Sequence, residues 1–303
     1  MTTTSASELP HRIAGDLTER LTRLDEAAAR VRVAADDEAI HDLRVVTRRL
    51  DAALRLWRPF LGGARRRARR RLRRLRRALG PVRELEVDVV RVRALRPRLD
   101  PEPAVAAEHL LVGLERRLER SRRDAARAAS AVRVVRVRRA IERALRNTER
   151  RVAEEPRPMG RLSATIFAAR EQARAALAEA MRTGDDAGLH GARIAVKRLR
   201  YAIETLGPAE GEAALARRAR DLQHALGDVH DTALLRDRIG RRVRRLREHG
   251  ADVGAAALGP LIELVEASRR EALAAAREQA ERLETRGHDR GLSVVARTGA
   301  EPV

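Results

Sequence analysis

The chain has 303 residues, and its 65 lysines and arginines against 44 acidic residues give it a formal net charge of +21. Aromatic residues make up only 1% of the sequence, which disfavours a protein that binds single-stranded nucleic acid by stacking bases on aromatic rings. The absence of cysteine excludes disulfides, thiolate metal sites and thiol nucleophiles, and suits a reducing cytoplasm. A polyanion is therefore the expected partner of this chain.

Apolar residues recur at helical spacing along almost the whole chain, and no stretch alternates with the period of a strand. The sequence therefore predicts an all-α fold. Prolines and glycines divide the pattern into separate predicted helices, on both sides of a proline-rich break. The predicted helices cover residues 12–33, 37–57, 64–79, 83–95, 104–152, 162–181, 188–206, 212–226, 230–249 and 261–283.

The break at residues 155–160 separates two predicted halves, residues 12–155 and residues 160–285. Residues 1–11 are expected to form a flexible N-terminus, and residues 286–303 a disordered tail, because the tail is rich in glycine and polar residues. The sequence has no run of about 20 apolar residues that could span a membrane, and no secretory signal is visible at its start. We therefore expect a cytoplasmic protein.

The two halves contain an internal repeat. Residues 40–50 align with residues 189–199 at an offset of 149, and in both blocks an apolar residue and a histidine come first. Residues 79–84, which begin Leu-Gly, align with residues 226–231 at an offset of 147. Two matched blocks at nearly equal offsets indicate the tandem duplication of a helical unit.

Each copy of the repeat carries a basic stripe along one face of its predicted helix. At about 100° per residue, His41, Arg44 and Arg48 share one face, while apolar residues such as Leu43 and Leu50 gather on nearly the opposite face. The apolar face is expected to be buried in a helical bundle, and the stripe to point away from it. In the second copy the stripe consists of His190, Arg193 and Lys197, with Tyr201 beside it.

Asp36 and Asp185 stand at the same offset as the histidines, where the N-caps of these two helices are expected. Both histidines then lie about one turn inside a helix, where free backbone N–H groups and the positive end of the helix dipole favour anions. For each stripe the alternative is an ordinary solvated face, and for each histidine alone it is a structural role.

Residues 65–77 contain ten arginines and no acidic residue. The apolar residues from Ala68 to Leu79 recur at spacings of four, three and four, which predicts a helix with one buried face. Arginines held together on an ordered helix repel one another unless an anion lies across them. The second copy is less basic here, but it keeps Arg217, Arg218 and Arg220.

The motifs of phosphate-loop enzymes, dinucleotide-binding enzymes, zinc proteases and serine hydrolases are missing from the sequence. His41-Asp42 and His230-Asp231 are dipeptides found in some metal phosphohydrolases, but they occupy non-equivalent repeat positions and lack further ligands at a suitable spacing. We therefore expect no enzyme, no metal site and no other cofactor. A phosphatase or phosphotransferase that acts through His41 or His190 is the least favoured class.

The twin histidine helices and the twin Leu-Gly blocks resemble the CHAD family, the conserved-histidine α-helical domains. The resemblance covers residues 12–285. It implies two four-helix bundles related by pseudo-symmetry, whose basic residues bind inorganic polyphosphate. It also implies an association with polyphosphate granules.

Inorganic polyphosphate, held without catalysis in a basic groove lined by both repeats, is thus the expected ligand. The alternative is a nucleoid-type protein that binds DNA or RNA through diffuse positive charge. The predicted polyphosphate-binding residues are His41, Arg44, Arg48, Arg49, Arg70, Arg73, Arg83, His190, Arg193, Lys197, Arg198, Arg200, Tyr201, Arg217, Arg220 and His230.

Overall fold

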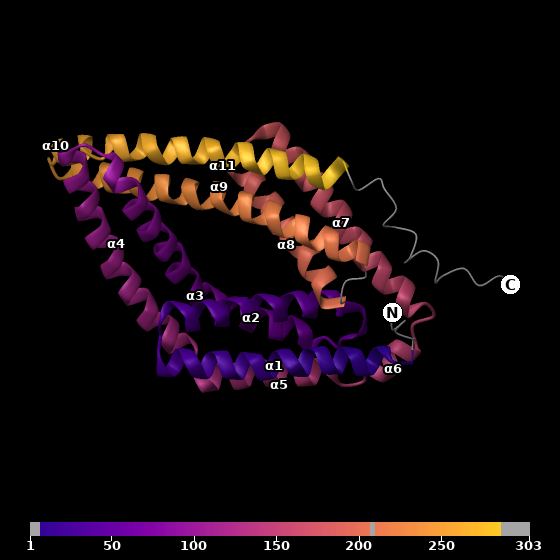
Figure 1. The fold of residues 1–303 in the computed structure, drawn as a ribbon. Helices are drawn as coiled ribbons and strands as arrows, with labels where there is room; N and C mark the ends of the chain where they lie inside the picture. Colours follow the sequence, from indigo (N-terminus) through magenta and orange to yellow (C-terminus); the bar gives the residue numbers. More distant parts are fainter. Residues whose placement is uncertain (1–6, 207–209, 286–303) are drawn as a thin grey trace.

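The computed structural model describes residues 7–206 and 210–285, and every regular element in these ranges is a helix (Figure 1). This confirms the all-α prediction. The predicted tail and residues 1–6 of the predicted N-terminal segment lie outside these ranges, but the segment was predicted too long, because α1 already begins at the buried Leu9. The elements are α1 (Leu9–Val33), α2 (Asp37–Leu56), η1 (Arg58–Phe60), α3 (Ala64–Leu95), η2 (Arg96–Arg98), α4 (Pro101–Ala128), α5 (Ala131–Leu145), α6 (Thr148–Ala153), α7 (Pro158–Thr183), α8 (Asp186–Leu206), α9 (Glu210–Glu248), α10 (Asp252–Ala256) and α11 (Gly259–Thr285).

The long helices form two layers joined at one end (Figure 1). Helices α1, α2 and α5 lie in one layer, and α7, α8, α9 and α11 lie in the other. Helices α3 and α4 run diagonally from the first layer to the end of the molecule that carries α10. Away from that end, the layers meet where α2 contacts α8, so this contact brings the two repeat copies together.

The buried apolar residues form two clusters. The larger one is centred on α1, α2 and α3 and includes the fully buried Trp57 and Phe60. The smaller one is built from α7, α8, α9 and α11, mostly with alanine and leucine. Helix α9 contributes to both, since Leu222 belongs to the smaller cluster while Leu235 belongs to the larger one. The division into two pseudo-symmetric bundles stays a prediction.

Both predicted N-caps are confirmed. The side chain of Asp36 accepts a hydrogen bond of 2.8 Å from the backbone N–H of Ala39 at the start of α2. The side chain of Asp185 accepts one of 2.6 Å from the backbone N–H of Gly188 at the start of α8. Each cap satisfies a backbone donor that the first turn leaves free, so the local sequence fixes where both stripe-bearing helices begin.

The helix end predicted at Gly80-Pro81 was wrong, because α3 continues through it. A proline inside a helix removes one backbone hydrogen bond and usually kinks or ends the helix. Here the guanidinium of Arg44 donates to the backbone oxygens of Leu79 at 2.7 Å and Gly80 at 3.1 Å. These bonds from α2 support α3 where the proline weakens it.

Two further boundaries differ from the prediction. Helix α9 passes without a break through Gly227, where the sequence predicted an end. Conversely, the single helix predicted over residues 104–152 is divided into α4, α5 and α6. The backbone at Asn147, between α5 and α6, is left-handed with φ of 62°, a conformation that asparagine tolerates better than most residues. Asn147 was therefore the sequence signal that could have predicted the break between α5 and α6.

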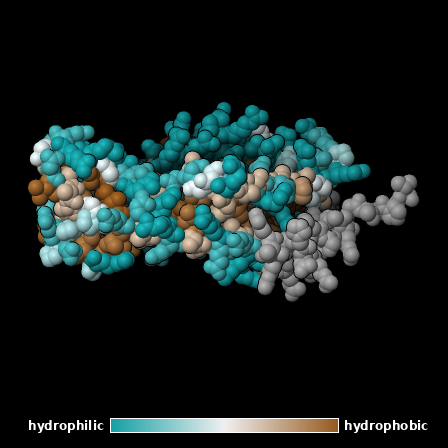
Figure 2. Space-filling view, turned by 90° about the horizontal axis from the view of Figure 1, so that it is seen from above, coloured by the Kyte–Doolittle hydropathy of each residue, from teal (hydrophilic) through white to brown (hydrophobic). Residues whose placement is uncertain are grey.

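Hydrophilic side chains cover most of the face seen in Figure 2, and hydrophobic ones gather at the end of the molecule that carries α10. Val253 of α10 is one of the exposed apolar residues, at 75% exposure. Among the described residues, no helix is both apolar and long enough to cross a bilayer.

Candidate functional site

The two predicted stripes converge where α2 and α8 meet. Each helix buries its apolar face, for example Leu43 and Leu50 on α2 and Leu199 on α8, so the stripes are held on the remaining faces. The charges of Arg193 and Arg200 on α8 lower the pKa of Arg48 on α2. The charges of Arg44 and Arg48 on α2 lower the pKa of Lys197 on α8. The four converging basic residues of the two stripes are here named the crossing cluster: Arg44, Arg48, Arg193 and Lys197.

The crossing cluster is partly withdrawn from water. Burial lowers the pKa of Lys197 to about 6, and the four strongest charged influences on it, all arginines, lower it further. Burial likewise lowers the pKa of Arg44 to about 10, and it lowers that of Arg48. Buried charge is costly unless an opposite charge is near. An anion bound here would therefore reduce the repulsion between these basic side chains in the folded chain.

Polar atoms in and beside the crossing cluster also lack hydrogen-bond partners. The Nε atoms of Arg48 and Arg193 and the Nδ1 atom of His190 are buried without a hydrogen bond to any described residue. Unsatisfied buried polar atoms are uncommon in proteins, and they often indicate a missing ligand or solvent molecule. The stripes thus supply both positive charge and free donors to the same space.

The Leu-Gly blocks of the repeat position the two inner arginines. Arg44 donates to the backbone of Gly80, as described above. In the second copy, a Cβ atom on Gly227 would lie 3.5 Å from Nε and 3.8 Å from Nη2 of Arg193, so that arginine lies directly over this glycine. In both copies, an arginine of the stripe packs on the glycine backbone of the following long helix.

The predicted histidines border the crossing cluster. The rings of His190 and His230 lie with their centroids 4.4 Å apart and their planes at 35°. Burial, followed by the charges of His190 and Arg193, lowers the pKa of His230 to about 4. Burial also lowers the pKa of the exposed His41, together with Arg48 and Arg83. Burial, together with Arg193 and Lys197, lowers the pKa of His190 as well, so the environment favours the neutral form of all three histidines.

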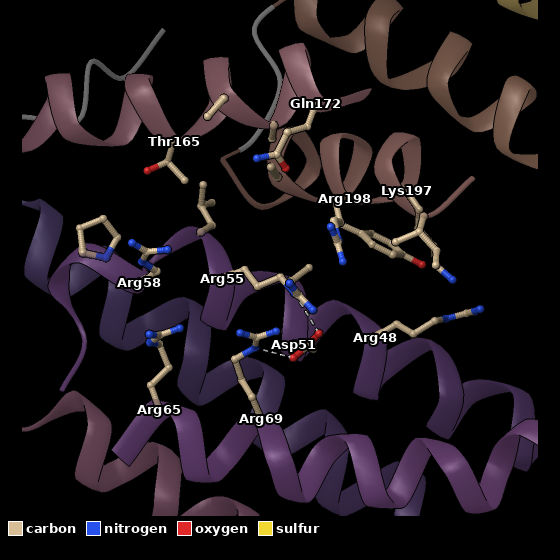
Figure 3. Close-up of a pocket in the computed structure, with 18 of the residues that line it drawn as sticks. Arg48, Asp51, Arg55, Arg58, Arg65, Arg69, Thr165, Gln172, Lys197 and Arg198 are labelled. Atoms are coloured by element: carbon tan, nitrogen blue, oxygen red, sulfur yellow. Dashed lines mark hydrogen bonds and ion pairs between the residues drawn. The ribbon is translucent and has the colours of Figure 1, made fainter. Parts of the chain in front are cut away.

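Next to the crossing cluster, a cavity of about 770 Å³ opens between the layers (Figure 3). Helices α2 and α3 form one wall, and α7 and α8 form the other. Four predicted site residues line it, namely Arg48, Lys197, Arg198 and Tyr201. Six further cations that line it are absent from the predicted site: Arg55, Arg58, Arg65, Arg69, Arg76 and Arg161.

The prediction chose the wrong arginines of α3 for this cavity. Arg70 and Arg73 are exposed and are not among the residues that line it, whereas Arg69 and Arg76 line it. The latter pair directly follows the buried residues Ala68 and Leu75, so it lies at the edge of the apolar stripe. That position beside the stripe is the signal that could have identified them.

Some predicted residues are held by partners within the chain. The guanidinium of Arg200 lies 4.5 Å from the centre of the Tyr201 ring, and its Nε lies 3.4 Å from a carboxylate oxygen of Glu204. Arg220 lies 3.6 Å from the same carboxylate. Arg49 and Arg217 are exposed on α2 and α9.

Asp51 is the acidic residue of the cavity, and three arginines surround it. Its carboxylate lies 2.9 Å from Arg69, 3.1 Å from Arg76 and 3.2 Å from Arg55, and Figure 3 shows Arg55 and Arg69 directed at it. Burial alone would raise the pKa of Asp51, but the three arginines lower it to about 2. Asp51 thus serves as the internal counter-ion of one wall.

Replacing Asp51 with asparagine is expected to lower the free energy of unfolding by about 3 kcal/mol, because three arginines then lose a buried counter-ion. The folded pKa lies below the usual 3.8, so this stabilisation is complete above pH 3.8 and disappears as the pH falls towards 2. Urea unfolding at low salt measures it. Asp124→Asn, which breaks an exposed pair with Arg127, is the control and should change little. Equal stability of D51N and the unmodified chain would contradict the counter-ion role.

Comparison with known proteins agrees with this architecture. The sequence matches the CHAD domain family over residues 15–240. The fold is similar to the crystal structure of the CHAD domain from the plant Ricinus communis, with a TM-score of 0.66 and 22% identity over 90% of this chain and 91% of that one. It is also similar to PptA from Streptomyces chartreusis, with a TM-score of 0.69 and 20% identity over 90% of this chain and 99% of that one. A search of curated proteins gives no match. Because the family match covers most of the length of this chain, the chain belongs to the CHAD domain family.

Proposed function

We propose that this chain binds inorganic polyphosphate and holds it, without catalysis, in the crossing cluster and the adjoining cavity. The observation that carries the proposal is the convergence of basic residues from both repeat copies at the contact between α2 and α8, where the Nε atoms of Arg48 and Arg193 are buried without a hydrogen bond to any described residue. A chain of closely spaced phosphates would supply counter-charge to both stripes at once, through charge-assisted hydrogen bonds. Association with polyphosphate granules would follow from the same binding.

The shape of the site favours polyphosphate over nucleic acid. The cations lie where two helices cross and along a cavity between layers, rather than on an open convex face. A flexible, unbranched phosphate chain can enter such a space, whereas a stiff DNA duplex would reach only its rim. Single-stranded nucleic acid would lack stacking partners, since Tyr201 is the one aromatic residue among those that line the cavity.

The site is suited to holding phosphate rather than cleaving it. Its arginines offer donors and positive charge, and the rings of His190 and His230 lie against each other at a tilt. Among the described residues, no group of three or more histidine, aspartate and glutamate side chains is placed to hold a metal ion. Within the proposal, the arginines are binding residues and the histidines border the bound chain.

Competition between labelled long-chain polyphosphate and duplex DNA at fixed salt tests the proposal. We expect polyphosphate to bind about tenfold more tightly or better, because it can reach the buried cations as well as the surface ones. The salt dependence of either complex does not discriminate, since both ligands release counter-ions. Equal or tighter binding of DNA would favour the nucleoid alternative. Release of orthophosphate in the presence of Mg²⁺, abolished by His41→Ala, would instead indicate an enzyme.

A further inference from the structure

A second group of arginines lies away from the α2–α8 contact, where α4 and α9 come together near the end that carries α10 (Figure 1). A cleft of about 280 Å³ opens between these two helices. This distal cleft is defined by the five arginines that line it: Arg116, Arg117, Arg238, Arg242 and Arg245. None of them belongs to the repeat-derived stripes or to the cavity described above.

The distal cleft resembles the crossing cluster in its excess of positive charge, although Arg116, Arg242 and Arg245 are exposed. Burial lowers the pKa of Arg117, and the four strongest charged influences on it are again all arginines. Of the five arginines, Arg238 is neutralised, because it pairs with the buried Asp88 and lies 3.8 Å from Glu84. In the described part of the chain, no ion pair joins the other four arginines to a carboxylate. Four guanidinium groups therefore share one cleft without a counter-ion.

The fold positions these side chains. Arg238, Arg242 and Arg245 follow one another at spacings of four and three, so they share a face of α9. The Nε of Arg245 donates to the backbone oxygen of Arg241 at 3.3 Å, which orients its guanidinium. Leu110 and Leu114 of α4 also line the cleft and are almost fully buried, so its arginines rest on a packed apolar floor. A rigid floor keeps like charges together, which an unstructured basic segment would not do.

From this arrangement we infer that the distal cleft is a second phosphate-binding site, which engages another segment of the polyphosphate chain held at the crossing cluster. The inference rests on the proposed function and extends it. His230, beside the crossing cluster, and Arg242, in the distal cleft, lie twelve residues apart on α9, or about 18 Å along the helix axis. A long chain can bridge this distance, whereas a triphosphate cannot. Two linked contacts raise the affinity for long chains by increasing the effective concentration at the second site.

The test compares two triple variants of the full chain. The distal variant carries Arg117→Gln, Arg242→Gln and Arg245→Gln, and it leaves Arg238 in place to preserve the ion pair with Asp88. The matched control removes the same charge from exposed positions of α5: Arg133→Gln, Arg136→Gln and Arg139→Gln. Both variants are titrated with long-chain polyphosphate and with triphosphate at one fixed salt concentration, and circular dichroism checks that both are folded.

We expect the distal variant to bind long-chain polyphosphate about tenfold more weakly than the control, and to take up one triphosphate fewer per chain. Equal affinity and equal stoichiometry in the two variants would overturn the inference. If the triple variant does not fold, the single charge reversal Arg242→Glu, compared with Arg139→Glu, gives the same contrast. Failure of the proposed function would give a different result. In that case the unmodified chain would bind duplex DNA as tightly as polyphosphate, or more tightly, in the competition experiment, whatever the two triple variants do.

Discussion

The chain in which Arg48 and Arg193 are both replaced by glutamine is expected to bind polyphosphate about 100-fold more weakly than the unmodified chain, or weaker still. The two residues come from different repeat copies, and the Nε atom of each is buried without a hydrogen bond to any described residue. A hydrogen bond to a charged group contributes about 1.5–3 kcal/mol, so the loss of two corresponds to about 3 kcal/mol or more. The double variant should melt no lower than the unmodified chain, because the substitutions also remove repulsion around Lys197.

The matched control replaces Arg133 and Arg139, which are exposed on α5, and changes the net charge equally. We expect it to lower the affinity only about threefold, because exposed arginines contribute mainly screened attraction. Direct titration at fixed salt measures both variants, and thermal melting followed by circular dichroism reports on the fold. If both pairs weaken binding equally while remaining folded, the stripes are ordinary solvated faces, and the repeat is only architectural.

Polyphosphate binding is expected to draw a proton from solution onto Lys197. In the free chain its pKa is lowered to about 6, so at about pH 8.5 the side chain is neutral. A bound phosphate chain favours the charged form and raises this pKa, so that binding takes up close to one proton. Affinity should therefore fall as the pH rises, by up to about tenfold for each pH unit between the pKa of Lys197 in the free chain and its pKa in the complex. Calorimetry in two buffers with different ionisation heats measures the uptake.

The variant Lys197→Met isolates this effect, since it keeps an unbranched side chain in the same space without a titratable group. Its proton uptake should be lower by nearly one, and equal uptake would show that Lys197 does not contact the ligand. In the absence of ligand, the lowered pKa of Lys197 makes the stability of the unmodified chain rise between about pH 6 and the ordinary value of 10.5. That rise should be missing from the variant.

The helix starts that matter most for the site could be predicted because their signals are local. Asp36 and Asp185 cap α2 and α8 with their own side chains, and the caps depend on residues only three positions away. The ends predicted at Gly80-Pro81 and Gly227 failed for the opposite reason. There, Arg44 and Arg193 pack on the backbone from other helices, and neither contact is visible in the local pattern.

The site was predicted unevenly for a related reason. The duplicated stripes identified the convergence of Arg44, Arg48, Arg193 and Lys197, because a repeated pattern marks its functional face twice. The arginine-rich start of α3 has no repeated pattern that distinguishes one face, because its arginines point in almost every direction around the helix axis. Which of them line the cavity depends on where α7 and α8 pack, and that is a property of the whole fold.

The sharing of α9 and α11 between the two apolar clusters has a consequence for the order in which the chain can fold during synthesis. The larger cluster is centred on helices that leave the ribosome first, yet it includes Leu235 and Ile239 of α9, Leu261 and Val265 of α11, and Leu258 between α10 and α11. A nascent chain that ends at the break between α6 and α7 therefore still exposes the apolar surface that these residues cover. The core around the first helices is therefore completed only after α11, the last helix, has been synthesised.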